Sequence, residues 1–194
     1  MEVNKTIIFN EVNEEIQENE ISEHKYSNIL ILNENCFCYS KKNEILVNKN
    51  DQTLIMTIKD DVEPDRINYL LKNKNGKILA CCFNHTIKVI KIDFINNSYF
   101  IEQRLKEHNL MITKLIELND NRICSCSYDG TIKLWRLNEI NLYDKEKNLF
   151  TKEKTIFYSI LEINNHFAVV LKDSNKNIWV YIIKENKKDN LLNE

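Results

Sequence analysis

Short apolar runs separated by polar breaks dominate the pattern along this chain. The runs at residues 29–32, 37–39, 44–47 and 54–58 are rich in Ile, Leu, Val and aromatic residues, and clusters of Asn, Lys and Asp separate them. β-Branched and aromatic side chains suit the pleated, half-buried surface of a sheet. Runs of this kind at spacings of about 8–12 residues predict an all-β sandwich, barrel or propeller.

A longer repeat along the chain favours one of these three folds. The third strand of successive units begins at Thr86, Thr131 and Asn177, so the units are 45 and 46 residues apart. A period in the forties with four short strands per unit is typical of a β-propeller, in which each unit forms one blade. The sequence therefore predicts a single domain over residues 1–194, with four blades of about four strands each.

The turns between runs give approximate boundaries for these blades. They are expected at residues 25–59, 64–105, 108–154 and 155–183. A lone N-terminal strand at 5–12 and an acidic linker at 13–24 precede them, and a polar tail follows at 184–194.

The third unit carries a motif. His108 precedes its first strand, residues 123–127 read Ile-Cys-Ser-Cys-Ser, and residues 128–136 read Tyr-Asp-Gly-Thr-Ile-Lys-Leu-Trp-Arg. This unit resembles a WD40 repeat, with Glu107 and Arg136 in place of the usual Gly and final Asp. A buried His can join a carboxylate to a hydroxyl, and a buried indole NH needs a partner. The resemblance implies a structural hydrogen-bonded set of four residues, namely His108, Ser125, Asp129 and Trp135.

The other units depart from this motif. In the second unit Asn84 and Ile90 replace the turn Asp and the Trp. The fourth unit keeps Asp173 but aligns Tyr181 with the Trp after a longer turn, and the first has Asn48 near that position. We expect these blades to depend on sheet pairing and on burial between blades.

Composition and charge exclude several classes of function. A net charge of −2 provides no basic field for nucleic acid. No run approaches the length of a membrane span, and the first residues lack a secretory signal. The six cysteines occur as Cys-x-Cys or Cys-Cys pairs, which suits reduced packing residues better than disulfides or zinc ligands. We therefore expect no metal, no cofactor, and a reducing location in the cytoplasm or nucleus.

The resemblance implies a non-catalytic scaffold that presents loops on one propeller face to a protein partner, as a subunit of a larger complex. Aromatic, Arg and Met side chains are favoured anchors of such interfaces, although the aromatic residues can instead pack against a neighbouring blade. The candidate contact residues on these loops are Arg66, Phe83, His85, Met111, Tyr128 and Lys172.

Two other functions stay open. A propeller enzyme or small-ligand-binding domain would use charged groups that converge in the central channel, where the innermost strands offer only Lys114, Glu117 and Glu162. The chain can also be a truncated or diverged fragment without a function of its own. A Ser–His–Asp hydrolase site is disfavoured, because Ser125 lies in mid-strand without a nucleophile elbow.

The length of the chain leaves two ways to complete the propeller. Most WD40 domains resemble seven-bladed rings of about 300 residues, whereas 194 residues accommodate four blades. The strand at 5–12 can complete a short fourth blade and close a small ring. Otherwise the propeller stays partial, and a second copy or another chain must cover its apolar edges. We favour the open array, because the wedge shape of WD40-like blades suits wider rings.

Overall fold

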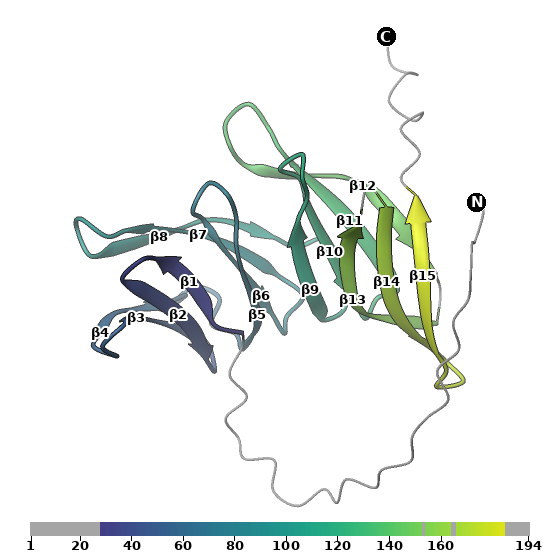
Figure 1. Ribbon diagram of the computed structural model, residues 1–194, viewed down its shortest axis with the longest axis horizontal. Coiled ribbons are helices and arrows are strands. Elements are labelled where there is room, and N and C mark those ends of the chain that lie inside the picture. Colours follow the sequence, from purple (N-terminus) through teal and green to yellow (C-terminus); the bar gives the residue numbers. More distant parts are fainter. Residues whose placement is uncertain (1–27, 153, 164–165, 185–194) are drawn as a thin grey trace, which may run out of the picture.

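The computed structural model describes residues 28–152, 154–163 and 166–184. The predicted strand at 5–12 and the acidic linker at 13–24 lie outside these residues, as does the tail after Lys184. Within them every regular element is a β-strand, which confirms the all-β prediction (Figure 1). No helix in this part of the chain is long and apolar enough to cross a membrane.

The strands form four antiparallel sheets, each built from strands consecutive in the chain. Blade 1 contains β1 (Leu30–Asn33), β2 (Cys36–Lys41), β3 (Glu44–Lys49) and β4 (Leu54–Lys59). Blade 2 contains β5 (Ile67–Lys72), β6 (Ile78–Cys82), β7 (Ile87–Asp93) and β8 (Ser98–Leu105). Blade 3 contains β9 (Ile112–Glu117), β10 (Ile123–Ser127), β11 (Thr131–Leu137) and β12 (Tyr143–Thr151). Blade 4 contains β13 (Thr155–Ile163), β14 (His166–Asp173) and β15 (Ile178–Lys184).

The apolar core lies between the sheets, in three clusters. One joins blade 1 to blade 2, the next joins blade 2 to blade 3, and the last joins blade 3 to blade 4. Strands β6 and β10 are buried along their whole length because both faces of their sheets are covered by a neighbouring blade. Each interior sheet is thus stabilised from both sides.

The six cysteines are packing residues in these clusters. All six are buried thiols. Burial raises the pKa of Cys38, Cys82 and Cys126 to about 12, so these thiols stay protonated near neutral pH. A protonated, buried thiol behaves as a small hydrophobic group.

Side chains at repeated positions also fasten consecutive blades through hydrogen bonds. Asn68 Nδ2 donates to the carbonyl of Ile112 at 2.5 Å, and Thr113, 45 residues after Asn68, donates to the carbonyl of Phe157 at 2.6 Å. Toward the other end of the strands, the carboxylate of Glu117 accepts the backbone NH of Lys74 at 2.8 Å. These bonds satisfy backbone groups on innermost strands and turns that lack a sheet partner on that side.

Gly130 lies in close contact with the connection that leaves blade 3 for blade 4. It lies in the turn between β10 and β11 with φ of 74°, and a Cβ atom there would lie 2.5 Å from the carbonyl oxygen of Lys152. Its own carbonyl accepts the NH of Lys152 at 2.9 Å. Only glycine fits this backbone without displacing the connection from blade 3 to blade 4.

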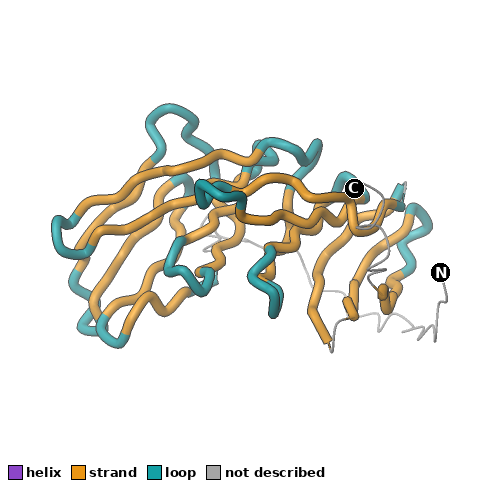
Figure 2. The backbone as a smooth tube through the Cα atoms, turned by 90° about the horizontal axis from the view of Figure 1, so that it is seen from above, coloured by secondary structure: helices purple, strands orange, loops and turns teal. Residues whose placement is uncertain are grey.

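The four blades stand in a curved row with blade 1 and blade 4 at its ends (Figures 1 and 2). Within the described residues, extensive contacts between blades join β5 to blade 1, β9 to blade 2 and β13 to blade 3. Blade 4 has three strands where the others have four. The described strands therefore form an open array.

Candidate partner-binding surface

Four side chains of blade 3 form one buried hydrogen-bonded chain. Trp135 Nε1 donates to Ser125 Oγ at 2.9 Å, and Ser125 Oγ lies 2.7 Å from His108 Nε2. The other ring nitrogen, His108 Nδ1, lies 2.8 Å from a carboxylate oxygen of Asp129. Because the carboxylate of Asp129 can only accept, Nδ1–H donates to it, and Nε2 of the neutral ring then accepts the hydroxyl hydrogen of Ser125.

Burial sets the charges within this chain. It lowers the pKa of His108 below 6.5 despite the carboxylate beside it, so the imidazole is neutral. Burial also acts to raise the pKa of Asp129, but hydrogen bonds from His108, Thr131 and the NH of Asn109 outweigh it and hold that pKa well below its usual range. The result is a neutral histidine bonded to a charged aspartate at neutral pH.

This arrangement fastens the blade and leaves Ser125 unavailable to a substrate. Ser125 is completely buried in the middle of β10, and its oxygen is engaged by Trp135 and His108. Asp129 meanwhile ties the connection before β9 to the turn between β10 and β11. The geometry is that of a structural staple between a loop and a sheet.

In blades 2 and 3 the entering loop and the turn between the second and third strands are hydrogen-bonded to each other and lie on one rim of the row. On blade 2 the guanidinium of Arg66 lies over the ring of Phe83, 5.1 Å from its centroid. The backbone NH of Phe83 donates to the carbonyl of Arg66 at 3.0 Å, which joins the loop to the turn. Phe83 is 42% exposed, so this cation–π pair is presented to solvent.

A second aromatic pair lies on the same rim. The rings of Tyr128 and Tyr158, from blades 3 and 4, meet edge to face with centroids 5.9 Å apart. The NH of Tyr128 donates to the carbonyl of Met111 at 2.9 Å. The structure thus joins Arg66 to Phe83 and Met111 to Tyr128.

Of the remaining two candidates, one lies in a turn and the other at the end of a strand. His85 adopts a positive φ of 69° in the turn between β6 and β7 and is half-buried. Lys172 is half-buried near the end of β14, opposite Ile178.

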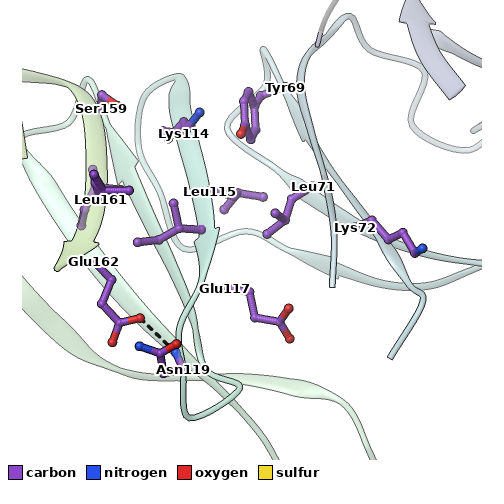
Figure 3. Close-up of a pocket in the computed structure, with 12 residues that line it drawn as sticks. Tyr69, Leu71, Lys72, Lys114, Leu115, Glu117, Asn119, Ser159, Leu161 and Glu162 are labelled. Carbon is purple, nitrogen blue, oxygen red and sulfur yellow. Dashed lines mark hydrogen bonds between the residues drawn. The ribbon is translucent and has the colours of Figure 1, made fainter. Parts of the chain in front are cut away.

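A groove of about 620 Å³ crosses the innermost strands β5, β9 and β13 (Figure 3). Residues at equivalent positions of the three strands line it in rows. One row contains Tyr69, Lys114 and Ser159; the next contains Leu71, Ile116 and Leu161; the last contains Lys72, Glu117 and Glu162. The ammonium of Lys114 lies 4.4 Å from the centroid of the Tyr69 ring.

The other charged groups of the groove are engaged in fastening blades. Glu162 accepts the NH of Asn119 at 3.0 Å, and Lys72 donates to the carbonyl of Leu32 at 2.5 Å, while Glu117 accepts from Lys74. The described residues contain no group of three His, Cys, Asp or Glu side chains close enough to hold a metal ion. These charges therefore serve the blade junctions and do not converge on a shared point.

Comparison with known proteins identifies the motif and the fold. Residues 101–136 match the family model described as "WD domain, G-beta repeat". The chain is similar in structure to the WD40 β-propeller domain of Doa1, with a TM-score of 0.65 and 19% identity over 84% of this chain and 51% of that one. Residues 101–136 therefore form a WD40 repeat, and the chain has the fold of a WD40 β-propeller.

A second solved structure is similar to this chain. It is the C-terminal WD40 domain of Sif2, with a TM-score of 0.59 and 18% identity over 84% of this chain and 48% of that one. The chain spans about half the length of both solved domains. A search of curated proteins found no match in sequence. The predicted WD40 propeller architecture is confirmed.

In blade 2 an ionic cluster that we did not predict takes the place of the hydrogen-bonded staple of blade 3. Arg104 contacts both carboxylate oxygens of Asp60, at 2.9 and 2.6 Å, and Lys88 Nζ lies 2.9 Å from the same group. Lys88 also donates to the carbonyl of Glu63. Burial acts to raise the pKa of Asp60, but Arg104 and Lys88 outweigh it and hold that pKa well below its usual range. The cluster anchors the loop that carries Arg66.

The strand register corrects our alignment of blade 4. In blade 3, Trp135 on β11 lies opposite Ile123 on β10, which lies opposite Glu117 on β9. In blade 4, Ile183 on β15 lies opposite Phe167 on β14, which lies opposite Glu162 on β13. Glu117 and Glu162 each accept a backbone NH from the preceding blade, so they mark equivalent positions. Ile183 therefore occupies the Trp position, and Tyr181 lies two residues before it.

We predict that Trp135→Ala lowers the free energy of unfolding by about 3–5 kcal/mol, because it empties a buried site and leaves Ser125 without a donor. Trp179→Ala is the matched control: Trp179 is half-buried and donates to Asp173, so its loss should cost less than about 2 kcal/mol. Urea unfolding of both variants measures this. A loss below about 1 kcal/mol for Trp135→Ala would contradict the staple.

We also predict that stability falls as the pH drops below about 6.5, the ordinary pKa of histidine. The folded state resists protonation of His108, so the unfolded state binds more protons in this range and is favoured by acid. Unfolding free energies at pH 7.5, 6.5 and 5.5 should show this slope, and His108→Gln should reduce it. The control His85→Gln alters a half-buried residue of the turn between β6 and β7, outside the hydrogen-bonded chain of blade 3, and should retain the slope. An unchanged slope in His108→Gln would show that another group is responsible.

Proposed function

We propose that this WD40 propeller domain is a non-catalytic scaffold that binds a protein partner. The contact surface is the rim that carries the Arg66–Phe83 and Tyr128–Tyr158 pairs. The observation behind the proposal is the exposed cation–π pair, since Arg and aromatic side chains on a rigid support are typical interface anchors.

Preorganisation of this rim supports the proposal. A loop that is already ordered loses little conformational entropy on binding. The Asp60 cluster fixes the loop before β5, and the His108–Asp129 bond fixes the connection before β9. Both aromatic pairs are therefore attached to loops that buried charged groups hold in place.

The groove gives weaker support to the enzyme or small-ligand alternative. Its two glutamates and Lys72 are engaged in bonds between blades, so a ligand would have to displace bonds that stabilise the fold. A surface whose anchors are exposed offers a lower cost of binding. We further propose a reducing compartment, cytoplasmic or nuclear, because six buried cysteines remain as thiols.

The test is affinity capture by the immobilised full chain, with bound proteins identified by mass spectrometry. We expect Phe83→Ala combined with Tyr128→Ala to abolish capture of the proteins that the wild-type chain retains. Circular dichroism should show that this variant keeps its β-sheet content, since neither residue belongs to the buried clusters.

A matched control removes two aromatic side chains elsewhere. Phe94→Ala combined with Phe100→Ala alters exposed residues of the β7–β8 hairpin and should leave capture unchanged. If the rim variant captures the same proteins at the same yield as wild type, the proposed surface is wrong.

A further inference from the structure

Two cations on or beside the partner-binding rim lie over aromatic rings instead of beside carboxylates. The guanidinium of Arg66 lies over the ring of Phe83, and the ammonium of Lys114 lies over the ring of Tyr69. Among the described side chains, neither cation forms an ion pair with a carboxylate. An aromatic ring attracts a cation without neutralising its charge, so both side chains keep a full positive charge.

Most carboxylates of the loops that enter blades 2 and 3 have partners within the chain. Three of them pair with cations, namely Asp60 with Lys88 and Arg104, Glu63 with Lys106, and Glu107 with Lys145. The carboxylate of Asp65, next to Arg66, accepts the backbone NH of Asn84. These acidic groups are engaged elsewhere, so Arg66 and Lys114 can bind an anionic group from outside the chain.

The two cations lie close enough for one short segment to reach both. Arg66 directly precedes β5, and Tyr69 lies three residues further along the chain. At about 3.3 Å per residue, these two positions are separated by about 10 Å along the strand. Tyr69, Lys114 and Ser159 form the row of the groove that lies nearest to the rim (Figure 3). An extended segment of a few residues that enters the groove from the rim therefore meets Arg66 first and Lys114 next.

Apolar side chains continue this surface into the groove. Leu71, Ile116 and Leu161 form the next row, which we call the apolar row, and Leu161 is 58% exposed. On the rim side, Tyr158 is 41% exposed and contacts Tyr128. The surface therefore offers two positive charges beside exposed apolar and aromatic groups.

We infer that the protein partner presents an acidic segment here, with carboxylates on Arg66 and Lys114 and apolar side chains on the apolar row. Hydrogen bonds between ionised donors and carboxylates are about twice as strong as neutral ones. Glu117 and Glu162 line the far end of the groove and repel further acidic side chains, which keeps the carboxylates at the rim end. The inference rests on the proposed function and adds the chemistry of the partner.

The test is binding of a fluorescein-labelled peptide to the full chain, measured by fluorescence anisotropy. The probe is Gly-Glu-Leu-Glu-Leu-Glu-Gly, and a matched neutral probe carries glutamine in place of each glutamate. We expect Lys114→Gln and Arg66→Gln each to weaken binding of the acidic probe by about tenfold, because each removes a charge-assisted contact. Lys114→Arg keeps the charge and should retain most of the affinity.

A matched control removes a cation outside this surface. Lys91→Gln alters an exposed lysine of β7 and should leave binding of the acidic probe unchanged. Circular dichroism should show the same β-sheet content in every variant. Higher salt should weaken binding of the acidic probe, because salt screens contacts between exposed charges.

Several results would overturn the inference. The acidic probe could fail to bind the wild-type chain, bind no better than the neutral probe, or bind Lys114→Gln and Arg66→Gln with unchanged affinity. Tighter binding of an oligothymidylate of the same length, lost in the same variants, would assign the cations to nucleic acid phosphates. Binding of the probe only after every glutamate of residues 13–24 is changed to glutamine would make the chain's own segment the occupant.

Failure of this inference is distinguishable from failure of the proposed function. Capture of proteins that depends on Phe83 and Tyr128, but not on Arg66 and Lys114, would contradict the acidic segment and leave the partner-binding rim in place. Capture that does not depend on Phe83 and Tyr128 would contradict the rim itself.

Discussion

Apolar burial between consecutive sheets is the interaction on which this structure depends. No blade has a core of its own, because the large side chains of each sheet point toward its neighbours and every core cluster draws on two blades. At about 25 cal/mol per Å² of buried apolar surface, these contacts supply most of the stabilisation. Hydrogen bonds donated by Asn68 and Thr113, and one accepted by Glu117, then fix the position of each sheet against the next.

The polar contacts that hold loops and turns differ from blade to blade, whereas every junction between blades contains an apolar cluster. Blade 3 uses the His108–Asp129 bond, and blade 2 uses the ion cluster around Asp60. In blade 4 the indole of Trp179 donates to Asp173 at 2.8 Å. Each device holds a turn or an entering loop against its sheet. This explains why the WD40 motif can be clear in one unit and degenerate in the others while the architecture is kept.

The strands and blades could be predicted because they repeat regularly along the sequence. Contacts between residues from different strands, which leave no pattern in the sequence, were missed. Alternating apolar runs and the spacing of Thr86 and Thr131 indicated strands and blades, because both follow from sheet geometry. The Asp60 cluster escaped notice because Lys88 and Arg104 come from two later strands and form no motif. Tyr181 was misaligned because the turn before β15 is longer, a change that only strand pairing reveals. Which side chains of the rim contact a partner remains a prediction.

Hydrogen exchange tests most directly whether each blade is stabilised by its neighbour. Phe167→Ala removes a buried ring that blade 4 inserts against blade 3. In an array of nearest-neighbour units, this change should speed amide exchange in β10 and β11 of blade 3 while β6 and β7 of blade 2 keep their wild-type rates. Faster exchange confined to blade 4, or equally faster exchange in blade 2, would contradict this account.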